Sequence, residues 1–166
     1  MTRSAQTAEE AIRVAGEMEE AGNLEAATAA LSTAIEQDQR NPKYRALRGR
    51  LFHLRGQWAE AIRDFDSALA LKPEAPTALY FRARARAMTD DLAGALQDFE
   101  HCLRLQPSSA DALVEIGHIH YYQGRHLRAL AAYRQAIALD PARGADVQAN
   151  ISEIEQITDE RPRAGR

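Results

Sequence analysis

The chain has 166 residues, and 45% of them are hydrophobic, which suits one soluble domain with a core. Its formal net charge of -3 and pI near 6.0 give no general attraction to nucleic acid or to an anionic membrane surface. Cys102 is the only cysteine, which excludes an intramolecular disulfide and a zinc site built from several thiolates. No run of about 18 apolar residues is present, and the first residues lack the apolar stretch of a signal peptide, so we expect a cytoplasmic protein.

The first seven residues precede the helical pattern, and we expect them to be disordered. From Ala8 onward, apolar residues recur at helical spacing and predict pairs of helices at 8–21 and 24–37, 42–55 and 58–71, 76–89 and 92–105, and 110–123 and 126–139. Three helix-start signals support these positions: a capping box of Thr7 and Glu10, the N-cap Asn41 before Pro42, and a box-like pair of Ser108 and Asp111.

After Pro141 the pattern changes to a single apolar stripe of Val147, Ile151, Ile154 and Ile157. Polar residues lie off this stripe, namely Gln148, Glu153, Glu155 and Gln156. The pattern predicts a capping helix over residues 144–158 that keeps the end of a helical stack soluble. Residues 159–166 lack apolar content, and we expect them to be disordered.

The four helix pairs form a repeat of 34 residues, because the blocks 8–41, 42–75, 76–109 and 110–143 align without a gap. The twentieth column of this alignment is alanine in every block, and the eighth is alanine or glycine. The twenty-fourth column holds Leu31, Phe65, Phe99 and Tyr133, and the fifteenth holds Gly22, Gly56, Asp90 and Gly124. A fixed period of this length indicates stacked units that cannot bury their apolar faces alone.

These columns resemble the tetratricopeptide repeat, which has a small residue in its first helix, alanine and then an aromatic residue in its second, and a closing proline. The closing positions here are Gln39, Pro73, Pro107 and Pro141, and the resemblance covers residues 8 to 143. It implies an all-α, right-handed α-solenoid of four helix-turn-helix repeats, followed by the capping helix.

In tetratricopeptide proteins one side of each first helix lines the concave groove, so the resemblance makes that side the candidate binding surface. At about 100° per residue this inner face comprises columns 2, 5, 6, 9, 12 and 13 of each block. The first block contributes Glu9, Ile12, Arg13, Gly16, Glu19 and Glu20. From the other three blocks we assign the partner-binding residues Lys43, Leu47, Arg50, His53, Thr77, Tyr80, Phe81, Arg84, Met88, Asp111, Glu115, His118, Tyr121 and Tyr122.

The aromatic members of this set are candidate anchors, because exposed aromatic groups beside charges mark binding surfaces; packing between adjacent helices is the alternative. Arg50 and Arg84 occupy one column of successive blocks and could receive a carboxylate or a backbone carbonyl. The lysine, asparagine and arginine clamp with which some family members bind chaperone tails is absent in either frame, so we do not expect that activity.

The charged residues do not predict a nucleic-acid site. Arginines two positions apart point about 160° away from each other on a helix, so we expect Arg82 and Arg86 to pair with acidic residues of neighbouring helices. Block 8–41 has a net charge of -6, from eight acids against two bases, and block 42–75 has +3, from seven bases against four acids. This asymmetry could orient a partner or join two copies head to tail, or the acidic block could simply be a solubilising cap.

Chemistry at single residues is not expected either. His118, His120 and His126 lack the i, i+4 spacing that places two metal ligands on one helical face. His118 near Glu115 is instead a candidate pH-sensitive groove contact. Cys102 lies in a column of small residues and is expected to pack in the core. No GxSxG, phosphate-binding loop or dinucleotide fingerprint is present, so we predict no cofactor, no metal and no enzyme.

We therefore expect a protein-interaction scaffold that binds an extended or helical segment of a protein or peptide in the groove. The alternative is a self-associating scaffold that forms a homo-oligomer through a repeat end or the convex face. Neither reading involves nucleic acid or a membrane. A small-molecule enzyme would need a convergent set of acids and bases, which we do not find.

Overall fold

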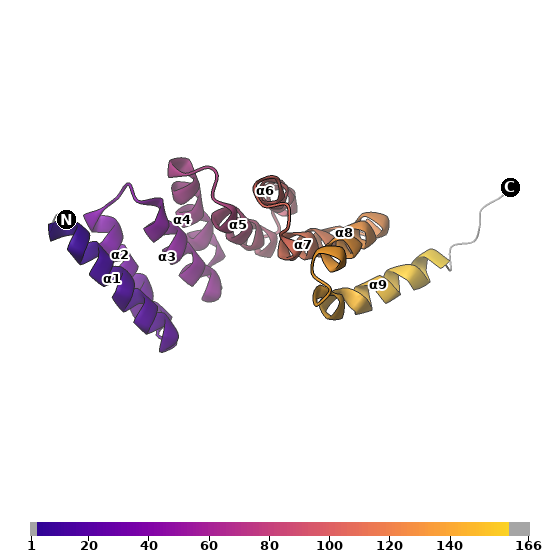
Figure 1. The fold of residues 1–166 in the computed structure, drawn as a ribbon, viewed down its shortest axis with the longest axis horizontal. Helices are drawn as coiled ribbons and strands as arrows, with labels where there is room; N and C mark the ends of the chain where they lie inside the picture. The colour runs from indigo at the N-terminus through magenta and orange to yellow at the C-terminus, as the bar shows by residue number, and fades with distance from the viewer. Residues whose placement is uncertain (1–2, 160–166) are drawn as a thin grey trace. The chain divides into compact units, whose positions relative to one another are not determined.

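The computed structural model describes residues 3–159, and side chains for residues 7–158. Over this range the chain forms nine helices and no strand, which makes it an all-α helical repeat solenoid (Figure 1). The helices are α1 (Arg3–Glu20), α2 (Leu24–Gln37), α3 (Pro42–Leu54), α4 (Trp58–Leu71), α5 (Pro76–Met88), α6 (Leu92–Leu105), α7 (Ala110–Tyr122), α8 (His126–Leu139) and α9 (Arg143–Asp159). Between Arg3 and Asp159, none of these helices combines the length and apolar content needed to cross a membrane.

The predicted helix positions are confirmed from residue 24 onward. The second helices start at Leu24, Trp58, Leu92 and His126, each 34 residues after the previous one (24, 58, 92, 126). The first helices α3, α5 and α7 end one residue before the predicted limit, because the next residue in each case is a C-cap with non-helical dihedral angles.

Helix α1 differs from the expectation at its start. It begins at Arg3, so residues 3–7 belong to a helix and not to an irregular segment. No glycine or proline occurs before Gly16 to end the helix, and Ala8, Ala11 and Tyr44 hold the first turns in a buried cluster. Thr7 therefore lies inside the helix, and the capping box predicted for Thr7 and Glu10 does not form an N-cap.

The other two start signals lie at helix starts that are capped in the structure. The Asn41 side chain accepts a hydrogen bond from the Lys43 N–H, as predicted, and Pro42 occupies the first turn. At α7 the cap is Ser109 and not Ser108, because Ser109 Oγ accepts from the N–H of Ala112. The sequence offered two adjacent serines, and only the backbone path decides which one reaches the helix.

The fifteenth column marks the turn inside each repeat. Gly22, Gly56 and Gly124 have φ of 75°, 71° and 69°, in the left-handed region that glycine enters without strain. Asp90 takes the same conformation with φ of 65°, although it is not a glycine and enters the left-handed region less readily. The repeat therefore conserves a backbone conformation more strictly than it conserves a residue.

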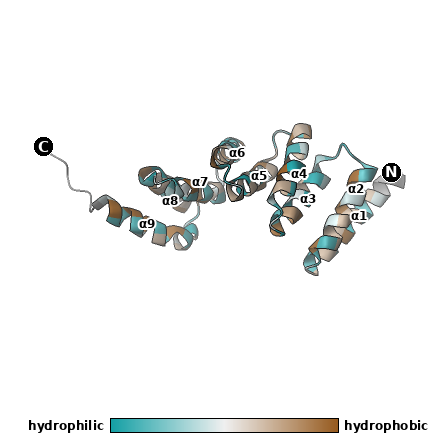
Figure 2. Ribbon diagram, turned by 180° about the vertical axis from the view of Figure 1, so that it is seen from behind, coloured by the Kyte–Doolittle hydropathy of each residue, from teal (hydrophilic) through white to brown (hydrophobic). Residues whose placement is uncertain are grey.

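The chain divides into two compact units at a point within α6, and each is described separately below. Unit 1 runs to Asp98 and unit 2 starts at Phe99. The core of unit 1 includes the buried side chains Leu31, Leu51 and Phe65. Figure 2 shows hydrophilic and hydrophobic residues interspersed along the helices, the pattern of helices that pack with one side only.

Arg82 and Arg86 of α5 are ion-paired, as predicted. Arg82 binds Asp98 with its Nε and Nη2 atoms, at 2.8 and 2.6 Å, and Asp66 with Nη1 at 2.7 Å. Arg86 Nη1 donates to Asp98 at 2.9 Å. These guanidinium groups are committed to the packing between helices, which removes them from any linear basic patch.

In unit 2 the core is completed by α9. Val147, Ile151 and Ile154 are buried against α7 and α8, and Ile157 is half-buried. The exposed residues of α9 include Gln148, Glu153, Glu155 and Gln156, so its predicted polar outer side is present. The helix extends one residue beyond the predicted range at each end, to Arg143 and Asp159. Of the tail predicted to be disordered, residues 160–166 lie outside the described part of the chain.

Candidate partner-binding surface

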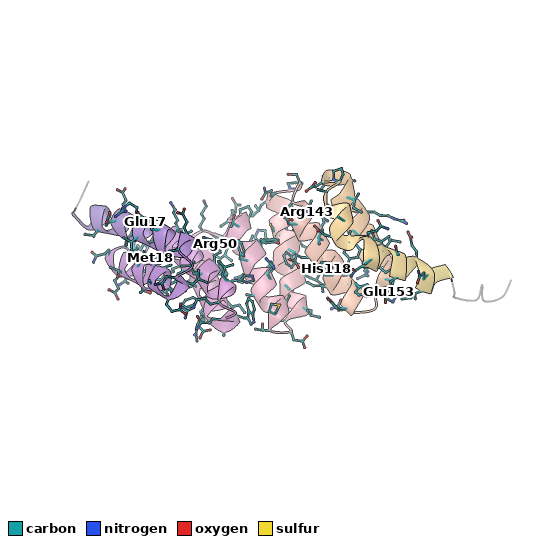
Figure 3. All side chains as sticks on the ribbon, turned by 90° about the horizontal axis from the view of Figure 1, so that it is seen from below. Glu17, Met18, Arg50, His118, Arg143 and Glu153 are labelled. Atoms are coloured by element: carbon teal, nitrogen blue, oxygen red, sulfur yellow. The ribbon has the colours of Figure 1, made fainter. Side chains whose placement is uncertain are left out.

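The inner face of unit 1 is formed by α1, α3 and α5, and an ion pair joins its first two helices. Arg50 Nη2 donates to Glu19 Oε2 at 2.6 Å, and both side chains are about one-third exposed. Figure 3 shows Arg50 on the side of α3 that faces α1. One acidic and one basic group are thus held together at the surface, where a partner can reach both.

The aromatic residues of α5 divide between packing and exposure. Phe81 packs inward, because its ring stacks on Phe65 with centroids 6.3 Å apart and meets the His53 ring at 5.6 Å. Tyr80 is half-buried and touches Phe81 edge to face at 5.4 Å. The Arg84 guanidinium lies 5.9 Å from the centroid of the Tyr80 ring, within the range of a cation–π contact.

The assignment of His53 to the binding surface is wrong. Its side chain is buried between α3, α4 and α5, with its ring 4.9 Å from the Trp58 ring and 5.6 Å from the Phe81 ring. The rings of Trp58 and Phe81 cover the His53 side chain, which occupies the twelfth column of the second repeat. Helical direction alone predicts which side of α3 a residue faces, and the size of its neighbours determines whether solvent reaches it.

The remaining predicted residues of unit 1 lie on the surface to different extents. Lys43 and Thr77 are exposed at the starts of α3 and α5, and Leu47 is half-buried. Met88 is 60% exposed at the end of α5, and Leu54, in the same column of α3, is 52% exposed. Both apolar side chains are thus open to solvent at matching positions at the ends of α3 and α5.

A hollow of about 170 Å³ lies between α1 and α3, and of its lining residues only Leu47 and Arg50 belong to the assigned partner-binding residues. Its lining from α1 includes Ile12, Gly16 and Glu19, which belong to the inner columns of the first repeat. The available signal was Gly16, which stands in the column that Arg50 and Arg84 occupy in the next two repeats. A glycine at a position that carries a long side chain in the next two repeats indicates open space at that point of the surface.

In unit 2 the predicted surface residues contact α9. Arg143 Nη2 lies 3.0 Å from Asp111 Oδ1, and the Tyr121 hydroxyl donates to a carboxylate oxygen of Glu153. This hydrogen bond raises the pKa of Tyr121. Figure 3 shows His118 on α7 and both Arg143 and Glu153 on α9. Helix α9 thus engages both ends of the face that the sequence assigned to a partner.

The other residues of α7 are partly accessible. His118 Nδ1 lies 4.0 Å from Glu115 Oε2, and its ring is 5.5 Å from the ring of buried Tyr133. Tyr122 is 80% exposed and meets the Tyr121 ring at 5.7 Å. The structure therefore brings Glu115 and His118 together, as predicted, and leaves Tyr122 as the aromatic residue of this unit most open to a partner.

Reactive side chains offer little chemistry in the described part of the chain. Cys102 is buried, as predicted for its column, and burial raises the pKa of its thiol. Among residues 3–159, no group of three or more histidine, cysteine, aspartate or glutamate side chains is arranged to hold a metal ion. Burial, together with Arg125 and Arg128, lowers the pKa of His120, which lies on the packing side of α7.

The sequence matches three family profiles, each described as a tetratricopeptide repeat, over residues 19–72, 55–115 and 110–143. No protein of curated function matches significantly. Similar solved structures include a MamA protein, with a TM-score of 0.79 and 19% identity over 93% of this chain and 90% of that one. The first tetratricopeptide repeat domain of Spaghetti (RPAP3), bound to the HSP90 peptide SRMEEVD, has a TM-score of 0.70 and 24% identity over 72% and 94% of the two chains.

An O-GlcNAc transferase of Thermobaculum terrenum has a TM-score of 0.70 and 22% identity over 81% of this chain, which corresponds to 27% of the transferase. Repeats of this kind therefore also occur within enzymes, and the absence of catalysis stays a prediction. At these identities the solved structures establish a common fold. The profile matches, the 34-residue helix spacing and the shared fold together show that the chain belongs to the tetratricopeptide repeat family.

Proposed function

We propose that this tetratricopeptide repeat protein is an interaction scaffold that binds a segment of a partner protein across the inner face of unit 1. The observation that carries the proposal is the placement of Arg50 and Arg84 in one column of α3 and α5. Arg50 is held by Glu19 at 2.6 Å, and Arg84 lies over the ring of Tyr80. Guanidinium groups held in place before binding lose less side-chain entropy when a carboxylate or a backbone carbonyl arrives.

The surroundings of the two arginines support a peptide-sized ligand. A guanidinium has five N–H donors, and the ion pair with Glu19 uses one of those on Arg50. The exposed Leu54 and Met88 side chains lie in matching columns at the ends of the same two helices. The surface thus combines polar groups that orient a main chain with apolar groups that supply binding energy.

The test is affinity capture from a lysate of the source organism with the double variant Arg50→Glu, Arg84→Glu. We expect this variant to lose the proteins that the wild-type chain captures while keeping its circular dichroism spectrum. The matched control is Arg63→Glu, Arg104→Glu, which makes the same change in net charge at two exposed positions of second helices. Equal capture by the two double variants and the wild type would exclude the inner face of unit 1 as the binding surface.

Self-association is a second candidate function, and one observation in unit 2 favours it. Tyr122 is 80% exposed and Leu127 is 74% exposed, on either side of the turn between α7 and α8. Two large apolar side chains this close in the chain can seed an interface between copies. Light scattering over a range of concentrations should then show an oligomer that Tyr122→Ser with Leu127→Ser dissociates, whereas a strict monomer excludes this function.

A further inference from the structure

The hollow between α1 and α3 has an apolar floor and a charged edge. Its lining includes Ile12, Gly16, Leu31 and Leu47, and Leu31 is almost fully buried. The ion pair of Glu19 and Arg50 also lines it, and both of these side chains are about one-third exposed. A Cβ atom added to Gly16 would meet no atom within 4 Å, so the space is open beside the helix.

The equivalent position one repeat later, between α3 and α5, is filled by larger side chains. Leu31 corresponds to Phe65 and Leu47 to Phe81, one repeat later, and those two rings stack with centroids 6.3 Å apart. Gly16 corresponds to Arg50, which has a long side chain. Each of these three positions in the lining of the hollow therefore carries a smaller residue than its counterpart one repeat later. Where Leu31 and Leu47 leave a hollow, Phe65 and Phe81 bring two rings together.

The volume of the hollow fits one side chain. At about 170 Å³ it is close to the roughly 150 Å³ of a buried apolar cavity that stays dry and binds benzene. Burying an aliphatic or aromatic side chain there removes apolar surface of both partners from water. This hollow gives the inner face of unit 1 depth beside its exposed groups.

The charges around the hollow determine whether a segment that inserts a side chain there should be acidic or basic. The inner side of α1 presents Glu9, Glu19 and Glu20; Glu19 is paired with Arg50, and Arg13 with Glu10 and Glu17. The first two repeats line the hollow together, and their net charges of -6 and +3 leave -3 over residues 8–75. A field of this sign attracts basic segments and repels acidic ones.

We propose that the hollow is a specificity pocket for one aliphatic or aromatic side chain of a partner segment with net positive charge. This inference rests on the proposed function, since it names the class of segment that the inner face of unit 1 binds. Gly16 keeps the pocket open, Leu31 and Leu47 line it, and Glu9 and Glu20 of α1 bind the basic residues that flank the anchor.

The experiment uses a display library of random short peptides selected on the full wild-type chain. Selected peptides are then synthesised and measured by fluorescence anisotropy against Gly16→Leu, which fills the pocket, and Gly16→Ala, which adds one methyl group. We expect the peptides to share one large apolar residue and an excess of lysine and arginine. Gly16→Leu, or replacement of that apolar residue by alanine, should weaken binding about tenfold or more, and Gly16→Ala should weaken it less.

Both Gly16 variants should fold, because the position lies within α1, faces open space and favours any residue with a higher helix propensity. Peptides that bind Gly16→Leu as tightly as wild type, but lose affinity for Arg84→Glu, would overturn the pocket and leave the proposed function intact. Peptides insensitive to both variants would overturn both proposals. A selected set with net negative charge would overturn the assigned charge of the partner.

Discussion

Arg48 and Asp64 form a two-pronged ion pair between α3 and α4: Nε and Nη2 of Arg48 donate to the two carboxylate oxygens at 2.7 and 2.8 Å. Arg48 Nη1 also donates to Ser32 of the preceding repeat at 2.9 Å. Arg82 and Asp98 repeat the arrangement 34 residues later. Because each arginine binds its own repeat and the one before it, the pair fixes the register between adjacent repeats.

Asp64→Ala should lower the free energy of unfolding by roughly 3 kcal/mol, because it leaves the half-buried Arg48 guanidinium without its carboxylate. The first and fourth repeats have apolar residues in these two columns, and the fourth uses Ile116 and Ala132. The double variant Arg48→Ile, Asp64→Ala copies that solution and should recover most of the loss. Urea unfolding followed by circular dichroism measures both, and a double variant as unstable as Asp64→Ala would show that the charges themselves are required.

Two glycines should respond in opposite ways to the same substitution. Gly56→Ala should destabilise the protein by about 1–2 kcal/mol, because the residue has φ of 71° and alanine is strained there. Gly16→Ala should stabilise it by roughly 0.5–1 kcal/mol, because this glycine lies inside a helix with open space beside it. Thermal unfolding of the two variants gives the comparison, and a shift of the same sign in both would contradict the assigned backbone conformations.

Gly117 should not tolerate alanine, although its column alternates between alanine and glycine. A Cβ atom at Gly117 would overlap the ring of Tyr133, which is fully buried in unit 2. We expect Gly117→Ala to lower the free energy of unfolding by about 1–3 kcal/mol through overpacking. Adding Tyr133→Leu reproduces the Ala15 and Leu31 combination of the first repeat and should relieve the overlap. No effect of Gly117→Ala on the denaturation midpoint would show that the ring moves freely.

His120 should make the protein less stable on mild acidification. Burial, with Arg125 and Arg128, lowers its pKa below the ordinary value near 6.5, and only Glu100 acts in the other direction among the nearby charges. Between the two pKa values the unfolded chain binds more protons than the folded chain, so the free energy of unfolding falls as pH drops below about 6.5. His120→Gln should reduce this slope between pH 7 and 5; an unchanged slope would assign it to other groups.

The sequence predicted which side of each helix the candidate residues face, but not which of them are buried or where the surface is hollow. Helical spacing assigns Arg50, Arg84 and Tyr80 to one side of their helices, because side-chain direction follows from residue number once the helix is known. In the structure Arg50 pairs with Glu19 of α1, and Arg84 lies over the Tyr80 ring. Helical spacing also assigns His53 to that side, where two aromatic rings bury it. Accessibility depends on the sizes of residues from several helices, which a single column does not contain.

The repeat, the helix positions and the turns follow from the residues alone, since helical periodicity and the left-handed conformation at the fifteenth column are local properties of each block. Which side chains the helices leave open to a partner depends on how the helices pack. The packing places α9 against Asp111 and Tyr121, and it leaves a hollow beside Gly16. These outcomes depend on how neighbouring volumes fit together, and packing of that kind is a property of pairs of helices and not of either one alone.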